Sequence, residues 1–119
     1  MTIQECYQAL GGDYQQVLRR LPSESLVARF LGKFPADGSF AQLSEAMDAG
    51  DRELAFRAAH TLKGVCANLN LDRLFASASA LTEVLRPAAS KIPAEAASLF
   101  RQVCSDYKLT VDAIRAFQG

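Results

Sequence analysis

Apolar residues recur at alternating spacings of three and four along most of the chain, as in amphipathic α-helices. Val, Ile and Thr are scattered, and no alternation of apolar and polar residues persists for four residues, as a strand would require. The hydrophobic pattern therefore predicts an all-α protein.

Residues typical of helix ends divide the chain into segments. The long segment after Asp51 should run to about Leu69, and a loop from Pro87 to Pro93 should precede the last helix. Asn70 suits a left-handed C-cap, so the helices on either side of it should be antiparallel neighbours. The expected N-terminal caps are Thr2 with Glu5, Asp13, Ser23, Ser39, Asp51 and Asp72, and the expected stops are Gly11 with Gly12, Pro22, Pro35 with Asp37 and Gly38, Gly50 and Pro87.

Each predicted helix has one apolar side. The simplest fold that buries all these sides is an up-and-down antiparallel four-helix bundle preceded by short N-terminal helices, with residues 1–119 forming a single domain. The residues expected to face the core are Leu26, Val27, Phe30 and Phe34, then Phe40, Leu43 and Met47, then Leu74, Ala78, Leu81 and Leu85, and finally Ala97, Phe100, Cys104, Tyr107, Val111 and Ile114.

Composition narrows the classes of partner. The 13 Lys and Arg residues balance the 13 Asp and Glu residues, which argues against nucleic acid as a partner. The N-terminus does not read as a signal peptide and no long apolar run occurs, so we expect a soluble, cytoplasmic monomer that does not bind membranes. Cys6, Cys66 and Cys104 lack CxxC spacing, so they predict buried thiols and no zinc site.

The single histidine stands apart from the apolar side of its helix. Leu54, Ala58, Leu62, Val65 and Leu69 fall within an arc of about 80°, and His60 lies about 160° from the centre of that arc. His60 should therefore project into solvent midway along a helix. The neighbours expected on the same surface are Phe56, Arg57, Lys63, Gly64 and Ala67.

Three of these neighbours are unusual on an idle helix surface. A glycine in mid-helix costs about 1 kcal/mol relative to alanine, so Gly64 suggests that open space beside His60 is useful. Lys63 could offset the charge of a phosphoryl group, and Phe56 suits a docking patch together with Arg57 and Ala67.

The facing helix can be aligned by counting from the turn. A hairpin that turns near Leu71 places Thr82 opposite His60 and Arg86 opposite Phe56. Thr82 could then orient an imidazole nitrogen by a hydrogen bond, and Arg86 could extend the cationic rim.

The segment Ala59-His60-Thr61-Leu62-Lys63-Gly64-Val65-Cys66-Ala67-Asn68-Leu69 closely resembles the signature of histidine-containing phosphotransfer (HPt) domains. His, Lys and Gly match this family in both type and register. The family commonly has Gly where Asn70 stands, often Ser where Val65 and Cys66 stand, and a Gln near the position given to Thr82.

This resemblance implies a phosphorelay intermediate. His60 would accept a phosphoryl group from a receiver-domain aspartate, or from a histidine-kinase module, and pass it to another receiver. The receivers would supply Mg²⁺, a hybrid histidine kinase is a further expected partner, and this chain would need no cofactor, metal or kinase activity of its own.

Rival functions fit the residues less well. A histidine-kinase dimerisation domain has an acidic residue directly after its histidine and a proline a few residues later, where this chain has Thr61 and Val65. A metal-dependent hydrolase would need a second ligand on the His60 surface, which is missing. The alternative left open is a non-catalytic adaptor bundle that binds a receiver without phosphotransfer.

Overall fold

The computed structural model describes residues 1–87 and 91–119. These residues contain no strand, so the predicted all-α class is confirmed. The predicted loop from Pro87 to Pro93 lies partly outside the described residues. The elements are α1 (Ile3–Leu10), α2 (Tyr14–Arg20), α3 (Glu24–Lys33), the 3-10 turn η1 (Phe34–Ala36), α4 (Ser39–Ala49), α5 (Arg52–Leu69), α6 (Asp72–Leu85) and α7 (Ala96–Gln118).

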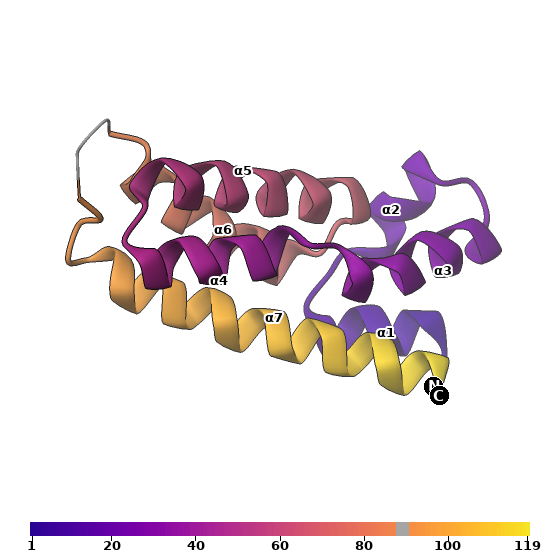
Figure 1. Ribbon diagram of the computed structural model, residues 1–119. Coiled ribbons are helices and arrows are strands. Elements are labelled where there is room, and N and C mark those ends of the chain that lie inside the picture. Colours follow the sequence, from indigo (N-terminus) through magenta and orange to yellow (C-terminus); the bar gives the residue numbers. More distant parts are fainter. Residues whose placement is uncertain (88–90) are drawn as a thin grey trace.

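Helices that follow one another in the second part of the chain pack side by side. Helix α4 packs on α5, α5 on α6, and α6 on α7, while α1 lies against the C-terminal part of α7 (Figure 1). Aromatic rings also join α4 to α7, since the Phe40 ring stacks on Tyr107 with centroids 4.0 Å apart and on Phe100 at 6.4 Å. The molecule is elongated, with extents of 45 × 25 × 19 Å, and α7 runs along most of its length.

Most of the predicted helix ends are confirmed. Thr2 and Glu5 form a capping box, and Asn70 ends α5 in the left-handed conformation with φ 52°. Ser39 and Asp72 are not caps, because each is already the first residue of its helix. The Asp37 carboxylate accepts a hydrogen bond from the Ser39 backbone N–H at 2.9 Å. The side chains of Asp13, Ser23 and Asp51 accept hydrogen bonds at the starts of α2, α3 and α5.

The predicted core is correct for α6 and partly wrong for α3 and α7. Leu74, Ala78, Leu81 and Leu85 are all fully buried, but Phe30 of α3 is 40% exposed. Helix α7 is rotated from the predicted seam, so Ala97 is exposed and Phe100, Cys104 and Tyr107 are only partly buried. The buried side of α7 includes polar residues whose groups are satisfied locally, and the hydrophobic pattern did not reveal them. Its members are Ala96, Val103, Asp106, Thr110, Val111, Ala113 and Ile114.

No helix in residues 1–87 and 91–119 is long and apolar enough to cross a membrane. The three cysteines are free thiols, of which Cys6 and Cys66 are buried and Cys104 is partly exposed.

Candidate functional site

Helix α5 presents His60 to solvent, although its buried side differs from the predicted one. Leu54 is 53% exposed and Val65 is only half-buried, whereas Ala55, Ala59 and Cys66 are fully buried. The buried side is rotated because α4 and α6 cover α5 from two directions, and Leu54 falls at the edge of the α4 contact. At about 100° per residue, His60 still lies about 150° from the centre of the observed buried side. Its side chain is exposed, as expected.

The imidazole of His60 rests beside one aromatic ring. The ring centroids of Phe56 and His60 are 6.1 Å apart, and the two planes are inclined by 19°. No hydrogen bond to the imidazole is present among the residues that the structure describes. The ring is therefore supported from one side by Phe56 and leaves its nitrogens available to an external group.

Gly64, one helical turn beyond His60, leaves open space on the surface. Apart from its chain neighbours and the adjacent backbone of α5, a Cβ atom built at Gly64 would meet no described atom within 4 Å. Gly64 also lies inside regular helix and has no positive φ, so neither a turn nor close packing explains the missing side chain. Since mid-helix glycine is unfavourable, this position gives up helix stability without any internal gain.

Lys63 provides a cation beside this open space. Its side chain is half-buried, and it forms no ion pair within the described ranges. The charge of Lys63 nevertheless acts across the helix pair, because it helps to lower the pKa of Glu83 on α6. Lys63 is therefore a cation whose hydrogen-bond donors remain available to an incoming anion.

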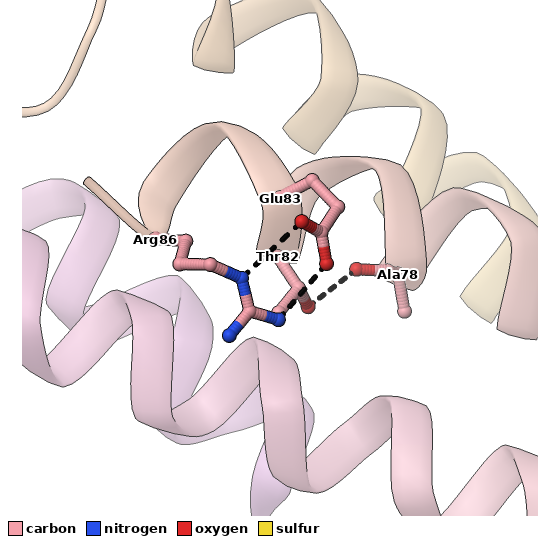
Figure 2. A network of polar contacts seen from close by, with 4 residues as sticks. All are labelled: Ala78, Thr82, Glu83 and Arg86. Atoms are coloured by element: carbon pink, nitrogen blue, oxygen red, sulfur yellow. Dashed lines mark hydrogen bonds and ion pairs between the residues drawn. The ribbon is translucent and has the colours of Figure 1, made fainter.

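The two residues predicted on α6 behave differently. The prediction for Thr82 is wrong, because its side chain is fully buried and its hydroxyl donates a hydrogen bond to the Ala78 carbonyl at 2.7 Å (Figure 2). The predicted pairing of Arg86 with Phe56 is confirmed, since the guanidinium carbon lies 5.3 Å from the Phe56 ring centroid. The hairpin count gave the correct pairing of helical turns, but the turn of α6 that carries Thr82 directs this side chain into the core.

An acidic residue that the sequence prediction missed stands next to Thr82. Glu83 accepts two hydrogen bonds from Arg86, from Nε to Oε2 at 3.2 Å and from a terminal nitrogen to Oε1 at 2.9 Å (Figure 2). The hydrogen bond and charge of Arg86, followed by the charges of Lys63 and His60, lower the pKa of Glu83. The signal that could have revealed this pair is the acid–base spacing of three residues on one helix.

Of the two remaining predicted docking residues, Arg57 lines a surface groove and Ala67 does not. Arg57 is exposed and forms an ion pair with Glu53, and Ala67 is half-buried farther along the same helix. A groove of about 470 Å³ separates this surface from α4. It is lined by Gln42, Glu45, Ala46, Ala49, Leu54, Arg57, Ala58 and Thr61.

The described residues contain no cluster of three or more His, Cys, Asp or Glu side chains that could hold a metal ion. The surface around His60 offers one exposed imidazole with a neighbouring cation, open space and an aromatic support, which suits the transfer of an anionic group to and from a ring nitrogen.

Comparison with protein-family models matches residues 25–117 to the Hpt domain. Comparisons with curated proteins and with solved structures gave no match. The matched range includes His60, all of helices α4 to α6, and α7 as far as Phe117. Because the match extends over most of the 119 residues, this chain belongs to the Hpt domain family.

Proposed function

We propose that this chain is a phosphorelay intermediate that carries a phosphoryl group on His60. Hpt domains serve histidine phosphotransfer in two-component phosphorelays. The observation that carries the assignment to His60 is its exposed imidazole, with Lys63 and the open space at Gly64 within one helical turn. The donor is a receiver-domain aspartate or a histidine-kinase module such as a hybrid kinase, and the acceptor is another receiver.

The transfer needs a neutral imidazole nitrogen and an exposed phosphorus atom. Nε2 of His60 attacks the phosphorus of the aspartyl phosphate, so that an N–P bond forms while the P–O bond to the carboxylate breaks. The aspartate leaves as a carboxylate, and the reverse reaction returns the phosphoryl group to a receiver. The receiver brings Mg²⁺ and acidic residues, while Lys63 adds a cation from this chain.

The surface around His60 would dock the receiver. Phe56 lies beside the imidazole, Arg57 lines the groove that extends this surface toward α4, and Ala67 lies farther along α5. We place this site on a single domain whose helices α4 to α7 serve as the up-and-down bundle. The domain would act as a monomer and carry the phosphoryl group without a kinase reaction of its own.

The proposal is tested by phosphorylating the protein in two independent ways. In the first, a purified receiver domain is charged at its aspartate with ³²P-acetyl phosphate and Mg²⁺ and then mixed with this protein. In the second, phosphoramidate modifies accessible histidines directly, and mass spectrometry locates the phosphoryl group. Label should appear on the wild type and be absent from His60→Gln, which retains a similar side-chain size without the nucleophilic nitrogen.

Three results would count against this function. Label retained on His60→Gln would place the phosphoryl group on another residue. Label absent from the wild type with both donors would reject phosphotransfer. Binding of the receiver without uptake of label would favour the adaptor alternative, and isothermal titration calorimetry with the uncharged receiver measures that binding.

A further inference from the structure

Glu83 and Arg86 form a short chain of contacts that ends at His60. The carboxylate of Glu83 accepts the two hydrogen bonds from Arg86, and the Arg86 guanidinium lies over the Phe56 ring at 5.3 Å. Phe56 in turn lies beside the imidazole at 6.1 Å between centroids. The sum of these two distances is the upper limit for the separation of the guanidinium carbon from the imidazole centroid. Arg86 is therefore held against Phe56, the ring that lies beside the imidazole, and its hydrogen bonds are directed to Glu83 (Figure 2).

The ion pair between Glu83 and Arg86 is exposed, and this makes it exchangeable. The side chains of Arg86 and Glu83 are 50% and 58% exposed, respectively. Exposed pairs contribute little to stability because water competes for both partners. A phosphoryl group carries more than one negative charge and several acceptor oxygens, so it can compete with a carboxylate for the forked donors of arginine.

The carboxylate of Glu83 also lies within electrostatic reach of the phosphorylation site. After the hydrogen bond and charge of Arg86, the charges of Lys63 and His60 also contribute to the lowered pKa of Glu83, so this carboxylate interacts electrostatically with both groups across the helix pair. A negative charge in this position attracts the cations that a phosphoryl group on His60 would use. It also repels the phosphoryl group itself.

We propose that Glu83 is a positioning residue that holds Arg86 away from His60 and thereby lowers the equilibrium share of phosphoryl groups carried by His60. This inference rests on the proposed function. As a consequence, phosphorylated His60 would be less stable, because the Arg86 guanidinium that could stabilise the phosphoryl group is already paired with Glu83. Glu83 would thus adjust the balance between this protein and its receivers without touching the reacting atoms.

The test measures the ratio of ³²P on this protein to ³²P on the receiver after exchange has reached equilibrium. Glu83→Gln keeps the side-chain shape and removes the charge, and it should raise this ratio about three- to tenfold at low ionic strength. The gain should shrink as salt is added, which a purely structural role of Glu83 would not produce. Glu53→Gln is the matched control, because Glu53 is 62% exposed and also forms an ion pair with an arginine of its own helix, Arg57.

A second pair of variants distinguishes two effects of Glu83: its pairing with Arg86 and its direct repulsion of the phosphoryl group on His60. Because Glu83 already engages Arg86, Arg86→Gln alone should change the ratio little, and adding Glu83→Gln to Arg86→Gln should give a smaller gain than Glu83→Gln alone. If Glu83→Gln raised the ratio equally in the wild type and in Arg86→Gln, the proposed role of Arg86 would be wrong. Thermal unfolding of each variant verifies that the fold is retained, as expected for substitutions in an exposed pair.

Failure of this inference differs from failure of the proposed function. If the wild type takes up label and Glu83→Gln shows the same ratio as the wild type and Glu53→Gln, Glu83 has no such role although the relay stands. If the wild type takes up no label from either donor, the proposed function itself is wrong.

Discussion

Replacing Gly64 by alanine should make the protein more stable and less active. The added methyl group would enter open space, because no described atom beyond the adjacent backbone of α5 lies within 4 Å of the Cβ position. The substitution thus introduces no clash in the isolated protein, and it removes the conformational freedom that glycine gives the unfolded chain. Any loss of function must then come from the complex with a partner.

The expected increase in the stability of the Gly64→Ala variant follows from helix propensity. Alanine in mid-helix is favoured over glycine by about 0.8–1.0 kcal/mol, which should raise the melting temperature of a domain of this size by about 4 °C. An extra methyl group at a closely packed interface costs about 1–3 kcal/mol. If that cost applies when a receiver approaches His60, the transfer rate should fall about five- to 150-fold.

Gly50→Ala is a matched control that should lower the stability of the protein, whereas Gly64→Ala should raise it. A Cβ atom at Gly50 would also meet no described atom within 4 Å beyond the adjacent residues, but Gly50 ends α4 with φ 68°. Alanine in this left-handed conformation costs about 1–2 kcal/mol, so Gly50→Ala should be destabilising and leave the rate of labelling of the folded protein unchanged. Urea unfolding measures the first effect, and rapid-quench transfer from a charged receiver measures the second.

Two results would refute this reasoning. Destabilisation by Gly64→Ala would show that the position is strained or tightly packed in solution. Unchanged transfer in a stabilised variant would show that open space beside His60 is not needed for the reaction, and Gly64 would then have no explanation in this structure.

Three further predictions concern Tyr7 and the cysteines. Tyr7→Phe removes the hydrogen bond that the Tyr7 hydroxyl donates to the Leu69 carbonyl at 2.8 Å, so urea unfolding should show a loss of about 1–3 kcal/mol, whereas Tyr14→Phe should change little and an equal loss in both would contradict this assignment. Burial raises the pKa of the Cys66 thiol to about 12, so the folded state keeps a proton that the unfolded state releases in alkali. Stability should therefore fall as pH rises above the ordinary thiol value, and Cys66→Ala should remove that part of the fall. At pH 8 Ellman's reagent should react with the partly exposed Cys104 before Cys66, and the reverse order would be incompatible with this packing.

The parts of the site that lie on one helix were predictable from sequence. His60, Lys63 and Gly64 share a surface because an α-helix turns by about 100° per residue whatever surrounds it. The capping box at Thr2 and Glu5 and the left-handed Asn70 were predictable for the same reason, since each depends on only a few adjacent residues.

The tertiary structure decided how each helix is rotated about its axis. Leu54 and Phe30 were expected in the core, but they remain exposed because neighbouring helices cover other sides of α5 and α3. In α7 the polar Asp106 and Thr110 point inward, where the Thr110 hydroxyl donates a hydrogen bond to the Asp106 carbonyl at 2.7 Å. A prediction based only on apolar residues places these two polar residues on the solvent-exposed side of α7, although both are buried.

The contacts between α5 and α6 at the site were also predicted only in part. Counting from the turn paired Arg86 with Phe56 correctly, but it selected Thr82 and missed Glu83. Adjacent residues on a helix point about 100° apart, so the choice between them depends on the rotation of α6 against α5. The sequence by itself determined the helical class, most helix ends and the surface around His60, because these follow from local geometry. The packing of α5 against both α4 and α6 decided which residues of the neighbouring helices reach that surface, because this packing fixes the rotation of each helix about its axis.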